Sequence, residues 1–155
     1  MFNVHALGGR EMMLRTVEEV NEACVRENLN RPKIVGVTVL TSSTANALDE
    51  VGIEREVEDE VLRLALLTAE CGLDGVVASP LEIMPIRNAI TKKDFLIVTP
   101  GIRPDFATND DQKRVMTPRE AVNEGSDYLV IGRPIIQAAD RLSAVKRILG
   151  EIQAA

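Results

Sequence analysis

A glycine followed directly by an arginine suits phosphate binding, and this chain carries such a pair near its end. Gly132 lets the backbone approach a ligand and offers its N–H, while Arg133 offers a planar fork of donors that matches phosphate oxygens. The segment after Pro134 would add a helix N-terminus, which also attracts anions. The same Gly-Arg-Pro string can be a tight turn with a surface arginine, and of the two interpretations we favour phosphate binding.

Other small, hydroxylated or cationic residues follow two further apolar runs. They are Pro100, Gly101 and Arg103 after residues 95–98, and Thr41 and Ser42 after residues 33–40. If those runs are parallel strands, their carboxyl ends meet at one edge, which is where α/β proteins bind ligands. Thr41 and Ser42 can bind a ligand there or cap the next helix, and the residue types favour neither role.

The longest stretch without a regular pattern, residues 104–116, contains Gln112. It is either a lid in which Gln112 donates to a phosphate, or a solvated polar loop, and the residues alone slightly favour the loop. His5, the one histidine, has no nucleophile or metal-type partner nearby in the chain, so we expect a structural histidine with a satisfied ring. No pair of acid–base groups follows the predicted strands, and no nucleotide-loop or zinc spacing occurs.

Apolar runs alternate with amphipathic segments throughout the chain. The predicted strands are residues 2–6, 33–40, 75–78, 95–98 and 128–131, and the predicted helices are 11–28, 54–70, 80–90, a short one from Thr117, and 140–153. The charged residues 54–60 are expected on the solvated face of their helix. Five β-then-α units predict an α/β fold with a parallel sheet. It is either an open doubly wound sheet or part of a (β/α)₈ barrel, whose units average about 31 residues.

Composition excludes several classes of function. The 18 Lys and Arg against 24 Asp and Glu give a net charge of −6, which argues against nucleic acid or an anionic membrane as a partner. No apolar run is long enough to span a bilayer, and the start lacks the pattern of a signal peptide. Cys24 and Cys71 have no metal-type spacing, so we expect reduced thiols in a cytoplasmic protein.

Six strings along the chain resemble the bacterial type of orotidine 5′-phosphate decarboxylase. They are Asn3–Gly9, Val37–Ser42, Cys71–Val77, Val98–Arg103, Asp111–Gln112 and Val130–Pro134, in that family's order and spacing. The resemblance implies a (β/α)₈ TIM barrel, a homodimer without a cofactor, and the conversion of orotidine 5′-monophosphate to UMP and carbon dioxide. It implies a substrate contact for Thr41 and a place facing the pyrimidine for Ser42. It implies binding roles on the ribose-phosphate side for Arg103, Gln112, Gly132 and Arg133.

The family's catalytic motif, Asp-x-Lys-x-x-Asp on the third barrel strand, does not occur in the 155 residues. By resemblance the chain covers strands four to eight, so we expect a single partial barrel domain, residues 1–155, without the first three βα units. We therefore expect no catalytic residue in this chain and no turnover by it alone. Five strands would leave two open edges, which predicts self-association.

Three alternative functions remain. The chain can be a non-catalytic phosphate- or nucleotide-binding half-barrel, or a fragment that complements a separate N-terminal piece. It can also be another phosphosugar barrel, such as a hexulose-phosphate synthase, which Thr41–Ser42 and Pro100–Arg103 disfavour.

Overall fold

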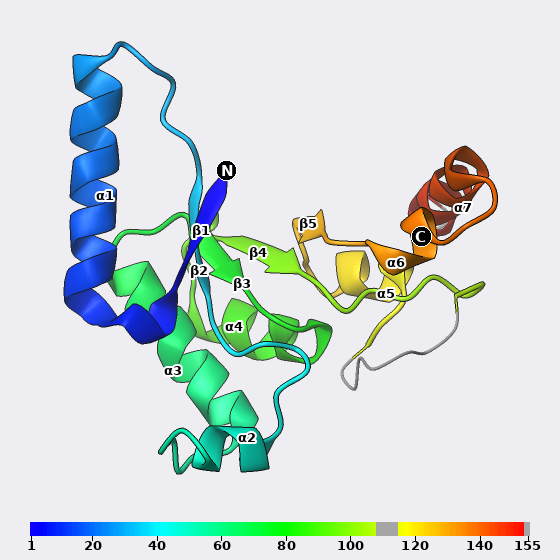
Figure 1. Cartoon of the computed structure of the whole chain (residues 1–155), viewed down its shortest axis with the longest axis horizontal. Helices are drawn as coiled ribbons and strands as arrows, with labels where there is room; N and C mark the ends of the chain where they lie inside the picture. Colours follow the sequence, from blue (N-terminus) through cyan, green and yellow to red (C-terminus); the bar gives the residue numbers. More distant parts are fainter. Residues whose placement is uncertain (108–114, 154–155) are drawn as a thin grey trace.

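A parallel β-sheet forms the centre of the computed structural model, which describes residues 1–107 and 115–153 (Figure 1). Within these ranges the strands are β1 (Phe2–His5), β2 (Ile34–Val37), β3 (Gly75–Val77), β4 (Leu96–Thr99) and β5 (Tyr128–Leu129). Their order in the sheet is β1-β2-β3-β4-β5, and every neighbouring pair is parallel. All five carboxyl ends therefore lie along one edge of the sheet, which we call the rim.

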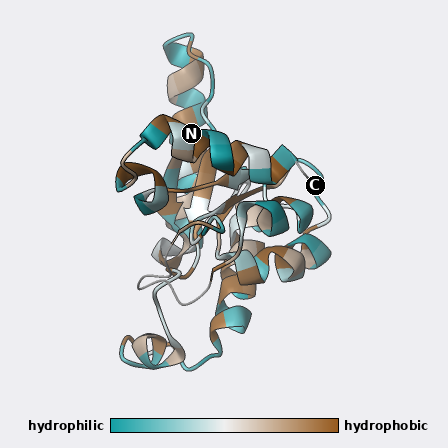
Figure 2. Ribbon diagram, turned by 90° about the vertical axis from the view of Figure 1, so that its right-hand side faces the viewer, coloured by the Kyte–Doolittle hydropathy of each residue, from teal (hydrophilic) through white to brown (hydrophobic). Residues whose placement is uncertain are grey.

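Helices connect the strands. The α-helices are α1 (Gly9–Arg26), α2 (Ala45–Asp49), α3 (Val57–Glu70), α4 (Ile83–Ala89), α5 (Pro118–Asn123), α6 (Arg133–Ile136) and α7 (Arg141–Gln153), and the 3₁₀ helices are η1 (Ala6–Gly8) and η2 (Pro80–Glu82). Figure 1 shows α1 on the side of the sheet where β1 lies, and α5, α6 and α7 on the side where β5 lies. Polar and apolar stretches alternate along the ribbons, as in amphipathic helices (Figure 2). None of the described helices is long and apolar enough to cross a membrane.

The strand order decides between the two architectures that the sequence left open. A doubly wound sheet reverses its strand order at a switch point. The described strands instead follow one another in chain order without a reversal. Right-handed crossovers in that order place all helices on the same side, as in a (β/α)₈ barrel. The chain is therefore a sector of a barrel, and no described strand covers the outer edges of β1 and β5.

The two faces of the sheet differ in what covers them. Val76 and Ile97 pair across β3 and β4 and belong to the apolar core shared with α3, whereas Val98 lies outside that core. In the same row as Val76, Gly36 lies under Thr68 of α3, and a Cβ at Gly36 would come within 2.8 Å of the Thr68 side chain. A glycine at this point lets α3 approach the sheet closely.

At the amino end of the sheet, Asp74 joins β2 to β3. Its carboxylate accepts a hydrogen bond from the Ile34 N–H at 2.8 Å, and its own N–H donates to the Ile34 carbonyl at 2.8 Å. Arg31 and Lys33 lie 2.6 and 3.3 Å from the same carboxylate. Burial raises the pKa of Asp74, but the Ile34 hydrogen bond and the two cations outweigh it, so that the pKa lies below its usual value.

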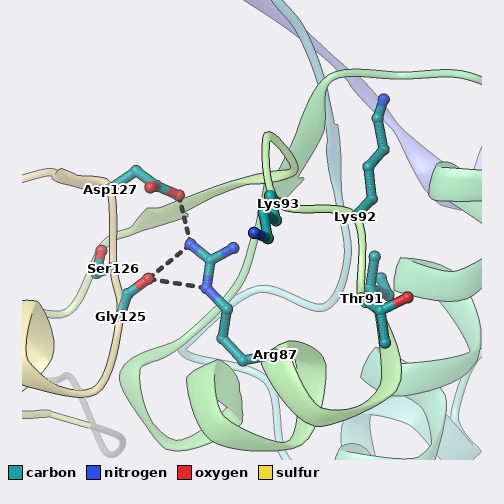
Figure 3. A pocket seen from close by; sticks show the side chains of 8 residues that line it. Arg87, Thr91, Lys92, Lys93, Gly125, Ser126 and Asp127 are labelled. Carbon is teal, nitrogen blue, oxygen red and sulfur yellow. Dashed lines mark hydrogen bonds and ion pairs between the residues drawn. The ribbon is translucent and has the colours of Figure 1, made fainter.

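Asp127 repeats this arrangement between β4 and β5. It accepts from the Ile97 N–H at 2.7 Å and donates its own N–H to the Ile97 carbonyl at 3.0 Å. Arg87 of α4 lies 2.6 Å from the carboxylate and also donates to the carbonyls of Gly125 and Phe95 (Figure 3). We call these two arrangements the aspartate clasps; each locks a pair of neighbouring strands.

The sequence predicted the elements well and some of their ends poorly. The five strands and the long helices are confirmed, and so is the short helix from Thr117, which begins with a capping box formed by Thr117 and Glu120. The segment after Ser79 begins as 3₁₀ helix instead of α-helix. Glu60 was expected on a solvated helix face, which is wrong: it is 1% exposed and bonded to Arg63, because two close guanidinium donors compensate for its burial.

Replacing Asp74 by alanine should destabilise the fold, because it leaves the Ile34 N–H without its acceptor. We expect a loss of about 1–3 kcal/mol in the free energy of unfolding at neutral pH, measured by urea denaturation. Because the folded-state pKa of Asp74 is lowered, its contribution is present above the unfolded value of 3.8 and is lost as the pH falls through the folded value. The curves of the wild type and the variant should therefore converge in acid.

The matched control is Asp94→Ala. Asp94 is exposed and lies 3.9 Å from Lys92, so its removal should change stability by less than about 0.5 kcal/mol. Equal losses in both variants would contradict a special role for the clasp.

Candidate functional site

The rim brings together the polar segments that the sequence singled out. The segments after β2, β4 and β5 all leave the sheet at its carboxyl edge. The Val130 N–H donates to the Thr99 carbonyl at 2.9 Å, which joins the segment after β5 to the end of β4. This hydrogen bond holds the segment before Gly132 and Arg133 next to the end of β4. The segment Pro100–Arg103 begins at that same point.

Arg103 is a buried cation at this rim. Only 8% of it is exposed, and its Nη1 donates to the Ile102 carbonyl at 3.0 Å. Its backbone N–H donates to the Met116 carbonyl at 2.9 Å, beside a bridge between Ile102 and Met116. Gly101, with a φ of 79°, makes the turn that leads to it. A buried guanidinium in a segment held on both sides can present a positive charge in a fixed place.

The polar loop after Arg103 is attached to the last helix. The guanidinium of Arg147 in α7 lies 3.9 Å from the centre of the Phe106 ring, a cation–π contact. Gln112, which the resemblance places on the phosphate side, lies outside the described residues. The described part of the loop therefore has anchors at Met116 and Phe106.

Gly132 offers open backbone rather than a strained turn. Its φ is −104°, and a Cβ built on it would meet no atom within 4 Å, so neither conformation nor packing requires glycine there. It caps the four-residue helix α6, and its carbonyl accepts from the N–H groups of Ile135 and Ile136. Arg133 is the first residue of α6 and is half-buried. The space before Gly132 is available to a ligand that approaches the backbone.

Thr41 and Ser42 do not cap the following helix. Thr44 does so, accepting a hydrogen bond from the Ala47 N–H at 3.4 Å. The capping alternative for Thr41 and Ser42 is therefore wrong. Thr41 is 8% exposed, whereas Ser42 is open to solvent, and both lie in a turn at the end of the segment that follows β2.

His5 ends β1 at the same rim. The sequence predicted a structural histidine with a satisfied ring, and this is wrong. The residue is exposed, and no hydrogen bond of its ring occurs among the residues that the structure describes. Strand β1 is an edge strand, and no described strand pairs with its outer side.

Sequence reasoning missed two buried polar residues after β3. Ser79 is 0% exposed and Glu82 is 4% exposed, both in the segment that leaves the middle strand of the sheet. The sequence predicted for this segment only a helix over residues 80–90. The available signal was its position directly after a strand, where Thr41 and Arg103 had been noticed. In the described ranges, no three His, Cys, Asp or Glu side chains lie close enough to hold a metal.

A cavity of about 550 Å³ lies at the opposite, amino end of the sheet. Arg87, Lys92, Lys93 and Asp127 contribute to its lining. Arg87 is already bonded to three oxygen groups of the clasp, and Lys92 extends away from it (Figure 3). In barrels this end serves stability rather than chemistry. We therefore assign this cavity to the clasp and not to the functional site.

Comparison with known proteins connects this rim to a family. Residues 1–148 match the family described as orotidine 5′-phosphate decarboxylase / HUMPS. The chain is 58% identical over 154 residues to orotidine 5′-phosphate decarboxylase of Geobacter metallireducens, which covers 99% of this chain and 63% of that protein. It is 59% identical over 152 residues to the same enzyme of Trichlorobacter lovleyi, covering 98% and 62%.

A solved structure agrees with the sequence comparison. Orotidine 5′-phosphate decarboxylase from Lactobacillus acidophilus superposes with a TM-score of 0.79 at 36% identity, covering 97% of this chain and 62% of that one. The chain thus spans less than two thirds of the length of the relatives that it matches.

Strand order and rim define part of a (β/α)₈ barrel with its polar segments at the carboxyl ends of the strands. Within that class, the chain belongs to the orotidine 5′-phosphate decarboxylase / HUMPS family.

Replacing Gly101 by alanine should strain the turn that leads to Arg103. A φ of 79° is unfavourable for a residue with a Cβ, so we expect a loss of about 1–2 kcal/mol in unfolding free energy. Gly150→Ala is the control, because Gly150 lies in α7 with open space around its Cβ and should stabilise by about 0.5–1 kcal/mol. Chemical denaturation measures both, and a neutral Gly101→Ala would contradict the strained turn.

Proposed function

We propose that this chain supplies the phosphate- and pyrimidine-binding part of an orotidine 5′-phosphate decarboxylase site. The observation that carries the proposal is the buried Arg103, at the same rim as Gly132 and Arg133, in a chain that belongs to this family. The substrate is orotidine 5′-monophosphate and the product UMP, in the last step of UMP synthesis.

Different residues of the proposed site bind different parts of the nucleotide. Arg103 and Arg133 supply positive charge to the phosphate, and the Gly132 N–H reaches an oxygen that a side chain would otherwise keep away. Thr41 contacts the substrate, and Ser42 faces the pyrimidine. Gln112, which lies outside the described residues, adds a neutral donor on the phosphate side. All these groups bind and orient, and none of them transfers a proton.

The chain by itself is proposed to be inactive. Decarboxylation needs a cation to stabilise the carbanion and a proton donor for the ring carbon. The family supplies both through Asp-x-Lys-x-x-Asp, a motif that the 155 residues do not contain. We further propose that the chain is a single partial barrel domain of a cytoplasmic homodimer and needs no cofactor. Strands that cover the edges of β1 and β5 would complete the barrel.

A binding function without catalysis is the second candidate. It is favoured because the 155 residues lack the Asp-x-Lys-x-x-Asp motif but keep the buried cation Arg103 at the rim. The two candidates differ in whether turnover appears when the first three βα units are supplied.

The test is a decarboxylation assay on the 155-residue chain, with a UMP titration beside it. We expect no turnover above a contamination control, and measurable UMP binding that Arg133→Ala weakens at least tenfold, since a charge-assisted hydrogen bond contributes about 1.5–3 kcal/mol. Arg15→Ala is the control, because Arg15 is exposed on α1, where it pairs with Glu18. Absence of UMP binding would refute the proposed site.

A second arm adds the first three βα units of a relative as a separate chain. Turnover on mixing supports the decarboxylase, and UMP binding without turnover in the completed barrel favours the binding module. Turnover by the 155-residue chain alone would show that the missing lysine is not essential and would overturn the proposed inactivity.

A further inference from the structure

The side chain of Ser79 is a buried polar group at the rim with no partner. The residue is 0% exposed, and its Oγ makes no hydrogen bond within the described parts of the chain. It precedes η2, where a serine hydroxyl ordinarily accepts from the N–H three residues on. Here the Glu82 N–H donates to the Ser79 carbonyl at 3.2 Å instead, and the hydroxyl caps nothing.

Other buried hydroxyls of the sheet are satisfied. Ser126 Oγ lies 2.7 Å from Thr99 Oγ1 and reaches the carbonyls of Ile97 and Tyr128. Thr38 Oγ1 donates to the Val77 carbonyl at 2.9 Å. Folded chains seldom leave a buried hydroxyl unpaired, since its lost hydration is then not replaced, and such a group needs an explanation.

Strand geometry places this hydroxyl on the face opposite to the apolar core that the sheet shares with α3. Ala78 and Val76 belong to the apolar core under the helices. Successive residues of an extended chain point to opposite faces, and Ser79 is extended with φ −69° and ψ 161°. Its side chain therefore lies on the same face as Val77, at the carboxyl end of the middle strand.

The position on the rim indicates which part of a ligand Ser79 meets. The segment carrying Thr41 leaves β2 on one side, and the segment carrying Arg103 leaves β4 on the other. The proposed phosphate groups follow β4 and β5, and the proposed pyrimidine contacts follow β2. A neutral hydroxyl between them matches the carbonyl, N–H or hydroxyl groups of the uridine part better than an anion, for which arginines already serve.

We propose that Ser79 is a further substrate-binding residue, whose hydroxyl exchanges a hydrogen bond with the uridine part of the nucleotide. The inference rests on the proposed function and adds to it a contact from the middle strand of the sheet. Because the hydroxyl makes no hydrogen bond within the described parts of the chain, a bond to the ligand breaks none inside the protein.

The experiment compares Ser79→Ala with Ser126→Ala in the full 155-residue chain. For Ser79→Ala we expect the UMP dissociation constant to rise about tenfold, as for the loss of one hydrogen bond, with inorganic phosphate affinity unchanged. Its thermal midpoint should stay level or rise, because an unpaired hydroxyl is removed. Ser126→Ala should lower the midpoint instead, because its partners lose their bonds, and should leave UMP affinity of the folded protein unchanged.

Three results would overturn the inference: unchanged UMP affinity in Ser79→Ala, an equal loss of phosphate affinity, or a lowered thermal midpoint like that of Ser126→Ala. The last result would mean that the hydroxyl supports the fold. If the wild type binds no UMP, the proposed function fails and this inference fails with it. If the wild type binds UMP and Ser79→Ala binds equally well, only this inference fails.

Discussion

Parallel pairing in chain order is the constraint on which the rest of this structure depends. The chain leaves every strand at the same edge of the sheet, so that residues as far apart in sequence as His5 and Arg133 share one rim. It also requires a helix in each crossover and places these helices on one face. The rim can then differ in chemistry from loop to loop while the sheet beneath it stays the same.

Sequence reasoning found the elements because each carries a strong local signal. The apolar run 33–40, the capping box at Thr117 and the glycine after α3 each predict their own piece of backbone. Strand order is a property of pairing between distant segments, so no local signal separated a barrel from a doubly wound sheet. Candidate residues such as Arg103 could be singled out because the residue type itself indicates the chemistry. The unpaired hydroxyl of Ser79 could not, because only tertiary burial distinguishes an unpaired serine from an ordinary cap.

The two ends of the sheet differ in whether the polar side chains discussed above have hydrogen-bond partners. At the amino end, the carboxylates of Asp74 and Asp127 each accept a hydrogen bond from a backbone N–H and pair with an arginine. At the carboxyl end, Ser79 is buried without a partner, and His5 stands exposed without one among the described residues. Polar groups that are satisfied within the chain hold the fold, whereas unsatisfied ones are the groups a ligand can use. A barrel sector thus separates stability from recognition along the strand direction.

The aspartate clasps also divide the sheet into parts. One clasp ties β2 to β3 and the other ties β4 to β5, and among the described residues neither β1 nor the junction of β3 with β4 has a comparable carboxylate. Strand β1 is held instead by a four-residue ladder with β2. Cooperative opening follows the weakest boundaries of a structure. The sector therefore contains two clasped strand pairs, and these pairs should separate from each other before either pair unfolds.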